Sequence, residues 1–382
     1  MDKVKQIGIH GFRRLHDMKI DMKPLMVMIG ANGAGKTSLL DAVYLLSSSA
    51  SGNINRTLND MGGIRDLITR GYTGDVVLSA SMRVAGYEPL EYSLCVQPKG
   101  QTYAISNEIL SQKRHGFAEP FKHIESNFDD IRYFDIESSK MTKPEWDFNF
   151  MESSLSQVPK MFKQPENLRK TLETVTQYHV LDVGKRAPVK LPQQMKPVEL
   201  PGADGEDLVS FLYYLRESNR NRYDAIEDTL KSAFPGFEYL SFPPVAAGML
   251  TMTWKEKQFN TPLFMHQMSE GTLRFIWLIA LLQSPGLSTV TMIDEPEVSL
   301  HPELLLILSD LLREASVRTQ IIVATHSDRL IRFLEPGEIF VMDIDEDGCT
   351  KGQWADAFDI DEWLHDYSLD EIWRLGRMGG RS

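Results

Sequence analysis

The sequence predicts an α/β protein with a mostly parallel central sheet, an antiparallel β lobe and an inserted mixed or helical lobe. Two stretches of alternating strand and helix patterns predict the parallel sheet, because short apolar strands separated by helices form βαβ units. The first stretch covers residues 1–75 and the second covers residues 204–382, and we expect them to form one core. Residues 76–203 lack this alternation and are expected to form the antiparallel meander and the inserted lobe.

The first stretch begins with a short strand at residues 4–9 and a turn at residues 11–14. Residues 26–29 are all apolar, which is typical of a strand buried on both faces. A glycine-rich loop follows, and residues 36–46 are predicted to be a helix.

The middle of the chain has a different pattern. Apolar residues alternate with others over residues 76–84, 90–96 and 103–105, which predicts a half-exposed antiparallel meander. Residues 112–177 are polar and mixed, and we expect them to be helical in part. Four prolines within residues 185–201 predict an extended segment, and residues 207–216 have one apolar face and predict a helix.

The last third returns to short apolar strands, at residues 290–293, 320–324 and 339–342. Helices are expected between them, at residues 302–315 and 328–333. This order places all three strands in the parallel sheet.

Composition limits the range of functions. The formal net charge of -12 over 382 residues opposes non-specific attraction to nucleic acid or anionic membranes. The two cysteines, Cys95 and Cys349, are far apart, which argues against a disulfide framework or a zinc site and fits a reducing cytoplasm. The most apolar stretch, residues 275–282, is shorter than the roughly 20 residues that span a bilayer. We expect a soluble cytoplasmic protein with no membrane partner.

The glycine-rich loop matches the Walker A pattern G-x-x-x-x-G-K-[ST], with apolar strand before and helix after. Backbone N–H groups of such a loop and the positive end of the helix bind phosphate. Lys36 is expected to reach the β- and γ-phosphates of ATP, and the Thr37 hydroxyl to hold Mg²⁺. The predicted nucleotide-binding residues of this loop are Gly30, Ala31, Asn32, Gly33, Ala34, Gly35, Lys36, Thr37 and Ser38.

A second motif ends the apolar strand at residues 290–293. Asp294 and Glu295 follow it, at the carboxyl edge of the sheet where α/β proteins bind ligands. This pattern is that of a Walker B motif, so Asp294 is expected to hold Mg²⁺ and Glu295 to polarise the attacking water.

Two further sites have both a structural and a functional interpretation. Ser269 precedes an apolar helix and fits a helix N-cap, but the free N–H groups there, with Gly271, can also bind an anion. His326 follows the strand at residues 320–324, where a loop histidine is ordinary. Its place one strand–helix–strand step after the Walker B motif favours a contact with the γ-phosphate.

The order of these motifs resembles the ABC-type ATPases of the RecF, SMC and OLD group. It comprises the Walker A loop, Met268-Ser269-Glu270-Gly271-Thr272, Asp294-Glu295-Pro296, Ser299-Leu300-His301-Pro302 and Ala324-Thr325-His326-Ser327. The chain looks most like small bacterial ATPases of this group that lack a coiled-coil arm. The tail, with residues 367–373 and Gly379-Gly380-Arg381, is similar as well, whereas the middle lobe is not covered.

The resemblance implies a homodimer, or a larger assembly, that closes two ATP sites. Ser269 and Gly271 would be the signature motif, which completes the ATP site of the opposite subunit. Residues 299–302 would be the D-loop that crosses the dimer interface, and His326 the switch histidine. Arg13 resembles a position near the nucleotide phosphates. The usual glutamine loop is not evident, and Gln193 and Gln194 are the candidates for it.

Several functions fit these motifs. We expect an ATPase that controls a separate effector protein, such as a nuclease, in bacterial anti-phage defence. A DNA-binding repair or maintenance ATPase of the RecF kind is the alternative; a transporter subunit and a non-catalytic scaffold fit the motifs less well.

Three other features bear on these alternatives. The basic residues Lys3, Lys5, Arg13, Arg14 and Lys23 are interpreted as solvated surface, with a DNA contact as the alternative. Residues 343–348 begin like a calcium-binding loop, but Trp354 stands where the last ligand should be, so we expect a hairpin turn. The stretch after His326 is too short for the nuclease domain of the OLD family, so no nuclease activity is expected in this chain.

Overall fold

The computed structural model describes residues 3–135, 138–359, 363 and 367–379. Gly380 and Arg381, which contribute to the resemblance of the tail, lie outside the described residues.

A six-stranded sheet forms the centre of the molecule, in the order β10-β16-β17-β3-β18-β19. Strands β10, β16, β17, β3 and β18 pair in parallel, and β19 pairs antiparallel with β18. The bounds are β3 Leu25–Gly30, β10 Thr176–Tyr178, β16 Val290–Asp294, β17 Gln320–Ala324, β18 Ile339–Ile344 and β19 Thr350–Trp354. The predicted α/β class with a mostly parallel sheet is confirmed.

A second, antiparallel sheet has eight strands in the order β2-β1-β4-β5-β6-β7-β8-β9. Their bounds are β1 Lys3–Phe12, β2 Leu15–Asp21, β4 Val76–Arg83, β5 Leu90–Lys99, β6 Thr102–Gln112, β7 Phe121–Asn127, β8 Asp130–Asp135 and β9 Lys140–Thr142. The expected meander is therefore present, but it also includes β1 and β2 from the start of the chain. The expected domain division at residue 75 runs through this sheet.

Two smaller sheets lie near the helices that cover the parallel sheet. One pairs β11 (Gln193–Gln194) with β13 (Met249–Leu250), and the other joins β12 (Phe237–Ser241), β14 (Thr253–Glu256) and β15 (Leu263–Phe264). The expected extended segment at residues 185–201 contains β11 and a short 3₁₀ turn at Pro188–Lys190.

Four of the five main helices follow the predicted positions with small shifts at their ends, whereas α7 was not predicted. They are α1 (Lys36–Ala50), α6 (Leu208–Ser218), α7 (Arg220–Ala233), α8 (Glu270–Gln283) and α9 (Glu303–Ser316). The shorter ones are α2 (Ile54–Asp60), α3 (Ile64–Leu67), α4 (Ser154–Gln157), α5 (Lys163–Glu173), α10 (Asp328–Ile331) and α11 (Leu369–Arg374), with 3₁₀ turns at Met265–Gln267, Pro336–Glu338 and Ala355–Ala357. Residues 112–177 are helical only in α4 and α5, and otherwise contribute strands β7 to β10.

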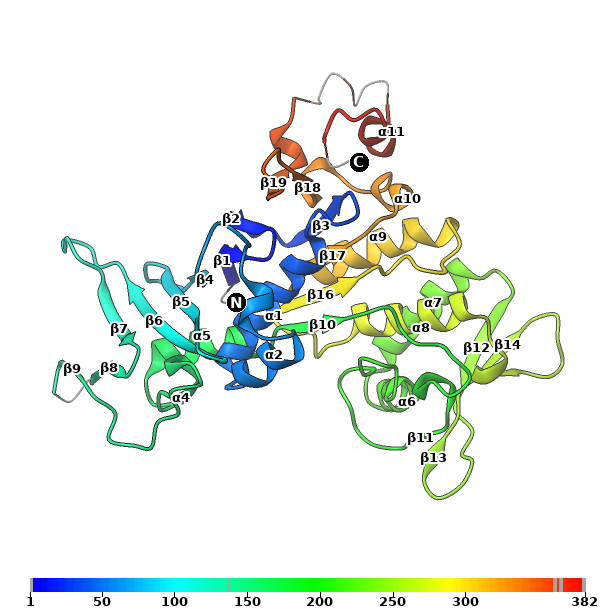
Figure 1. Ribbon diagram of the computed structural model, residues 1–382. Coiled ribbons are helices and arrows are strands. Elements are labelled where there is room, and N and C mark those ends of the chain that lie inside the picture. Colours follow the sequence, from blue (N-terminus) through cyan, green and yellow to red (C-terminus); the bar gives the residue numbers. More distant parts are fainter. Residues whose placement is uncertain (1–2, 136–137, 360–362, 364–366, 380–382) are drawn as a thin grey trace.

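Two apolar cores hold these layers together, and strand β3 contributes to both. Val27 and Ile29 pack with α6, α7, α8 and α9, whereas Met26 and Met28 pack with α1 and the antiparallel sheet. Helix α1 therefore lies between the two sheets, as Figure 1 shows, with β4–β9 on one side and the parallel strands on the other. Burial of each large apolar side chain contributes about 1.5–3 kcal/mol, so both cores fix the position of the loop between β3 and α1.

Residues 345–349 form the turn of the β18–β19 hairpin, as expected for the acidic segment. The Asp345 carboxylate accepts hydrogen bonds from the backbone N–H groups of Asp347 and Cys349, at 3.1 and 2.8 Å. Among the described residues, no helix is both long and apolar enough to cross a bilayer.

Candidate functional site: a phosphate loop and an acidic strand end

The loop between β3 and α1 has the geometry of an anion cradle. Gly30 has a φ of 155°, and a Cβ there would lie 2.3 Å from the Met342 carbonyl oxygen, so only glycine fits. Gly35 occupies the N-cap of α1 in the left-handed conformation and provides no side-chain cap. The N–H groups of the first helical turn thus have no side-chain acceptor at the cap and can bind phosphate oxygens.

Lys36 is buried, with only 5% of its surface exposed. Its Nζ donates to the carbonyl oxygens of Gly30 and Ala31, at 2.6 and 3.2 Å. Burial lowers the Lys36 pKa to about 8, although Glu295 and Asp294 oppose this shift. The ammonium group thus lies against its own loop, and a phosphate would offer it a charged acceptor, which makes a stronger hydrogen bond than a carbonyl.

The rest of the loop shows a mixture of exposed and buried residues. Asn32, Gly33 and Thr37 are exposed, Ala31 and Ser38 are half-buried, and Ala34 and Gly35 are buried. The Thr350 hydroxyl on β19 donates to the Ala34 carbonyl at 3.0 Å and so anchors the loop from the edge strand two positions away from β3.

The acidic pair lies at the carboxyl end of β16. Glu295 has a φ of 49°, which is rare for a side chain of this size and costs about 1–3 kcal/mol. Its backbone N–H donates to the Ala324 carbonyl of β17 at 2.8 Å, which holds the strained residue in place. Burial and the charge of Glu295 raise the Asp294 pKa.

His326 lies beside these acids, with its Nε2 3.6 Å from a Glu295 carboxylate oxygen. Burial and the nearby Lys36 charge lower the His326 pKa, while Glu295 and Asp294 oppose this effect. These interactions show that Lys36, Asp294, Glu295 and His326 share one site at the carboxyl edge of the parallel sheet.

Glu297 is a member of this site that sequence reasoning missed. Its Oε1 accepts hydrogen bonds from the Thr325 hydroxyl at 2.5 Å and from the His326 backbone N–H at 3.2 Å. Its Oε2 is buried without a hydrogen-bond partner in the described structure, and burial raises the Glu297 pKa. Glu297 therefore ties the loop that carries His326 to the end of β16. A third acid two residues after Glu295 was the only signal for it in the sequence.

The end of β10 also reaches the site. This short strand pairs in parallel with β16, and His179 just after it has its Nδ1 4.0 Å from an Asp294 carboxylate oxygen. Gln177 on β10 has a buried Nε2 without a partner among the described residues. Gln193, one candidate for the glutamine loop, is instead buried, where it donates to the Gly205 carbonyl and accepts from the Val209 N–H, and Gln194 pairs with Met249 of β13.

Arg13 lies at the margin of the site. It forms an ion pair at 2.5 Å with Asp41, which is one helical turn beyond Thr37 on α1. The charge of Asp41 is also one of the groups that raise the Asp294 pKa. The Arg13 side chain thus ends on α1 beside the phosphate loop.

Ser269, which is exposed, and Gly271, which is half-buried, lie at the start of α8. The Ser269 hydroxyl caps the helix by accepting from the Thr272 N–H at 3.1 Å. A Cβ at Gly271 would lie 2.4 Å from the Ser299 carbonyl oxygen, and Arg274 donates to the Ser299 hydroxyl. In the described part of the chain, no hydrogen bond joins Ser269 or Gly271 to the loop at residues 30–37.

Comparisons with known proteins agree with this geometry. A family described as "AAA domain, putative AbiEii toxin, Type IV TA system" matches residues 25–332. The "DNA replication and repair protein RecF" of Francisella tularensis subsp. mediasiatica is 31% identical over 78 residues, which is 19% of this chain and 22% of the relative. RecF of Crocosphaera subtropica is 33% identical over 113 residues, which is 29% of this chain and 27% of that protein. The chain thus matches less than a third of the length of these relatives.

Solved structures show the same fold. The SmcHead bound to the C-winged helix domain of ScpA superimposes with a TM-score of 0.58 at 14% identity, over 92% of this chain and 97% of that one. The SMC head domain from Thermotoga maritima has a TM-score of 0.50 at 12% identity, over 92% and 98%. The chain has the fold of the SMC head domains, and it belongs to the AbiEii-like AAA domain family.

Proposed function

We propose that the chain binds and hydrolyses ATP as an ATP-gated homodimer, and that this cycle controls a separate effector protein in bacterial anti-phage defence. One observation carries the proposal: Lys36, Asp294, Glu295 and His326 converge on one site, while the exposed Ser269 and the half-buried Gly271 make no hydrogen bond to its phosphate loop among the described residues. A P-loop site that lacks its signature residues is completed when a second copy supplies them.

Nucleotide binding rests on the loop at residues 30–37 with Ser38. The N–H groups at the start of α1 would bind the phosphates, and Lys36 would move from its own loop carbonyls to the β- and γ-phosphates. Thr37 and Asp294 offer two oxygen ligands, which suits Mg²⁺ because it takes one or two protein oxygens besides phosphates and water. Bound Mg²⁺ would neutralise charge on the phosphates.

Hydrolysis needs a group that orients the attacking water. Glu295 is suited to this because its strained backbone projects the carboxylate at the end of β16, beside His326. His326 would contact the γ-phosphate, and Glu297 would hold its loop in position through two accepted hydrogen bonds. Ser269 and Gly271 of the second copy would add donors to the same phosphate, so that ATP holds the dimer together.

The defence role is supported by the family, whose description names a type IV toxin–antitoxin system. We also propose that residues 1–75 and 204–382, together with strand β10, form the ATPase core, with the rest of residues 76–203 as an inserted lobe. A DNA-binding repair ATPase is the second candidate. The RecF relatives and a basic surface described below favour it, and stimulation of hydrolysis by DNA would distinguish it.

The test is a Glu295→Gln variant, which keeps the shape of the site and removes the carboxylate that orients water. With Mg-ATP it should form a stable dimer in light scattering after gel filtration and hydrolyse ATP far more slowly than the wild type. A Lys36→Ala variant is the matched control and should not dimerise when Mg-ATP is added. Normal hydrolysis by Glu295→Gln, with no ATP-dependent change in mass or shape, would show that the mechanism is wrong.

A further inference from the structure

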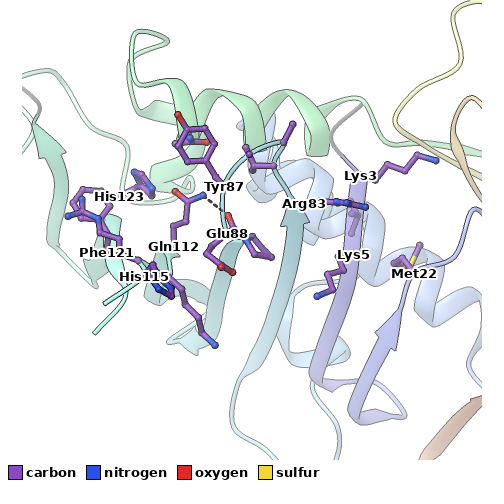
Figure 2. Close-up of a pocket in the computed structure, with 18 of the residues that line it drawn as sticks. Lys3, Lys5, Met22, Arg83, Tyr87, Glu88, Gln112, His115, Phe121 and His123 are labelled. Atoms are coloured by element: carbon purple, nitrogen blue, oxygen red, sulfur yellow. Dashed lines mark hydrogen bonds between the residues drawn. The ribbon is translucent and has the colours of Figure 1, made fainter. Parts of the chain in front are cut away.

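A large basic trough lies at one end of the antiparallel sheet. Its walls are the β4–β5 turn, the segment between β6 and β7, the start of β1 and Gln164 of α5, and its volume is about 1610 Å³. Figure 2 shows Lys3, Lys5 and Arg83 on one side, and His115, Phe121 and His123 on the other. Small-molecule pockets measure about 300–1,000 Å³, so the trough is larger than a metabolite needs.

The charge of the trough contrasts with that of the chain. Five cations line it, Lys3, Lys5, Arg83, Lys113 and Arg114, against the single carboxylate of Glu88, in a protein of net charge -12. No described carboxylate lies within 4.0 Å of any of these five cations. Lys3 is the direct cross-strand partner of Arg83, and like charges in that position destabilise a sheet. An anionic ligand would offset this repulsion.

Aromatic rings accompany the cations. Tyr87 on the β4–β5 turn is 64% exposed, and the Arg114 guanidinium lies 3.6 Å from the centre of the Phe121 ring. His123 packs against Phe121, and burial, followed by the Arg114 charge, lowers the His123 pKa to about 4. The buried Nε2 of this neutral imidazole has no hydrogen-bond partner among the described groups. Cations alone bind any polyanion, whereas exposed rings and guanidinium planes also stack on bases.

We propose that the trough binds a single-stranded nucleic acid. The cations would contact its phosphates, while Tyr87 and the Arg114–Phe121 pair would stack on unpaired bases. A duplex keeps its bases stacked inside and offers no ring face to Tyr87. An acidic peptide would satisfy the cations but leave the exposed aromatic ring without a partner.

Strands that begin at the trough extend to the ATP site. Pro24 and Gln320 line it at the amino ends of β3 and β17, whereas the phosphate loop follows the carboxyl end of β3. Gln320 bonds both the N–H and the carbonyl of Val4, at 2.9 and 2.8 Å, and so joins β17 to the start of β1. Strand β1 runs from Lys3 in the trough to Phe12, next to Arg13 at the margin of the ATP site. The inference goes beyond the proposed ATP cycle and does not depend on it.

The experiment measures fluorescence anisotropy of a labelled oligo-dT against the full-length protein at several salt concentrations. One variant combines Lys5→Glu, Arg83→Glu and Lys113→Glu. Its matched control reverses three exposed lysines outside the trough, Lys99, Lys140 and Lys257, with the same change in net charge. The trough variant should bind more weakly. Its slope of log Kd against log salt should be smaller by about 2, because each of the three lost phosphate contacts contributes about 0.7. The control should keep the wild-type slope.

A second pair of variants tests stacking without a change of charge. Tyr87→Ala should weaken oligo-dT binding at least about fivefold, and Tyr87→Phe should restore it. Equal binding by the trough variant and its control, equal binding of a duplex of the same length, or competition by poly-glutamate as strong as by oligo-dT would each overturn the proposal. ATP-dependent dimerisation of Glu295→Gln is unaffected by these outcomes, so the two proposals fail separately.

Discussion

The contact between Gly271 and Ser299 allows a quantitative test of the proposed dimer. In Gly271→Ala the new Cβ would lie 2.4 Å from the Ser299 carbonyl oxygen, where ordinary contacts begin at 3.4 Å. The start of α8 must therefore move by about 1 Å away from residues 299–302, as in other overpacked sites. Overpacking costs about 1–3 kcal/mol, and the better helix propensity of alanine offsets up to about 1 kcal/mol. We expect a small loss of stability.

The effect on the dimer should be much larger. A shift of about 1 Å breaks a hydrogen bond from the signature motif to the phosphate of the opposite subunit, and such a bond to a charged group contributes about 1.5–3 kcal/mol. Because a two-fold dimer contains two such sites, the ATP-dependent dimer Kd should rise at least about 100-fold. ATP binding to the monomer should stay unchanged, because Gly271 does not contact the phosphate loop through hydrogen bonds in the described structure.

The assay is sedimentation equilibrium with Mg-ATP in the Glu295→Gln background, with calorimetry for nucleotide binding. Gly74→Ala is the matched control, since a Cβ there meets nothing within 4 Å and its φ is not positive. Wild-type dimer affinity for Gly271→Ala, or the same loss for Gly74→Ala, would refute the reasoning.

Two further predictions concern the ATP site itself. A bound phosphate raises the Lys36 pKa above its free value of about 8, so the affinity for Mg-ATP should be full below pH 8 and fall as the pH rises through that value. Titration calorimetry checks this, and an affinity that is constant to about pH 9.5 would contradict it. Glu297→Ala removes the acceptor for Thr325 and His326, and should lower kcat and cost about 1–3 kcal/mol of stability. Glu297→Gln keeps an acceptor and should retain kcat. Because burial raises the Glu297 pKa, the neutral amide should also give a higher melting temperature than the wild type at neutral pH. Equal melting temperatures and equal kcat for the Ala and Gln variants would contradict this role.

The motifs of the core could be predicted because their signals are local. The apolar run of β3, the glycines after it and the acids after β16 each describe one strand and its end. In parallel sheets the carboxyl ends of strands meet at one edge, so the convergence of Lys36, Asp294 and Glu295 follows from strand order. Their chemical roles stay predictions.

Other parts depend on distant partners and give no local signal. Strand β7 has only Ile124 and Ser126 buried along Phe121–Asn127, so its alternation is weak, and pairing with β6 and β8 places it in the sheet. Strand β10 has three residues and gains its position from β16, more than a hundred residues later, which is why His179 was missed. Of the cations in the basic trough, the sequence indicated only Lys3 and Lys5. Arg83, Lys113 and Arg114 are distant in sequence and come close to them because the antiparallel sheet folds them together.

The central claim is that each ATP site combines the phosphate loop of one copy with the signature motif of the other. The most direct measurement mixes Lys36→Ala with Ser269→Arg, each inactive alone, and follows ATP hydrolysis. A mixed dimer holds one fully defective site and one intact site, so an equal mixture should recover up to about a quarter of wild-type activity. If each site were built within a single chain, every site in the mixture would carry one of the two substitutions. A mixture that shows no ATP hydrolysis at any ratio would therefore contradict the account.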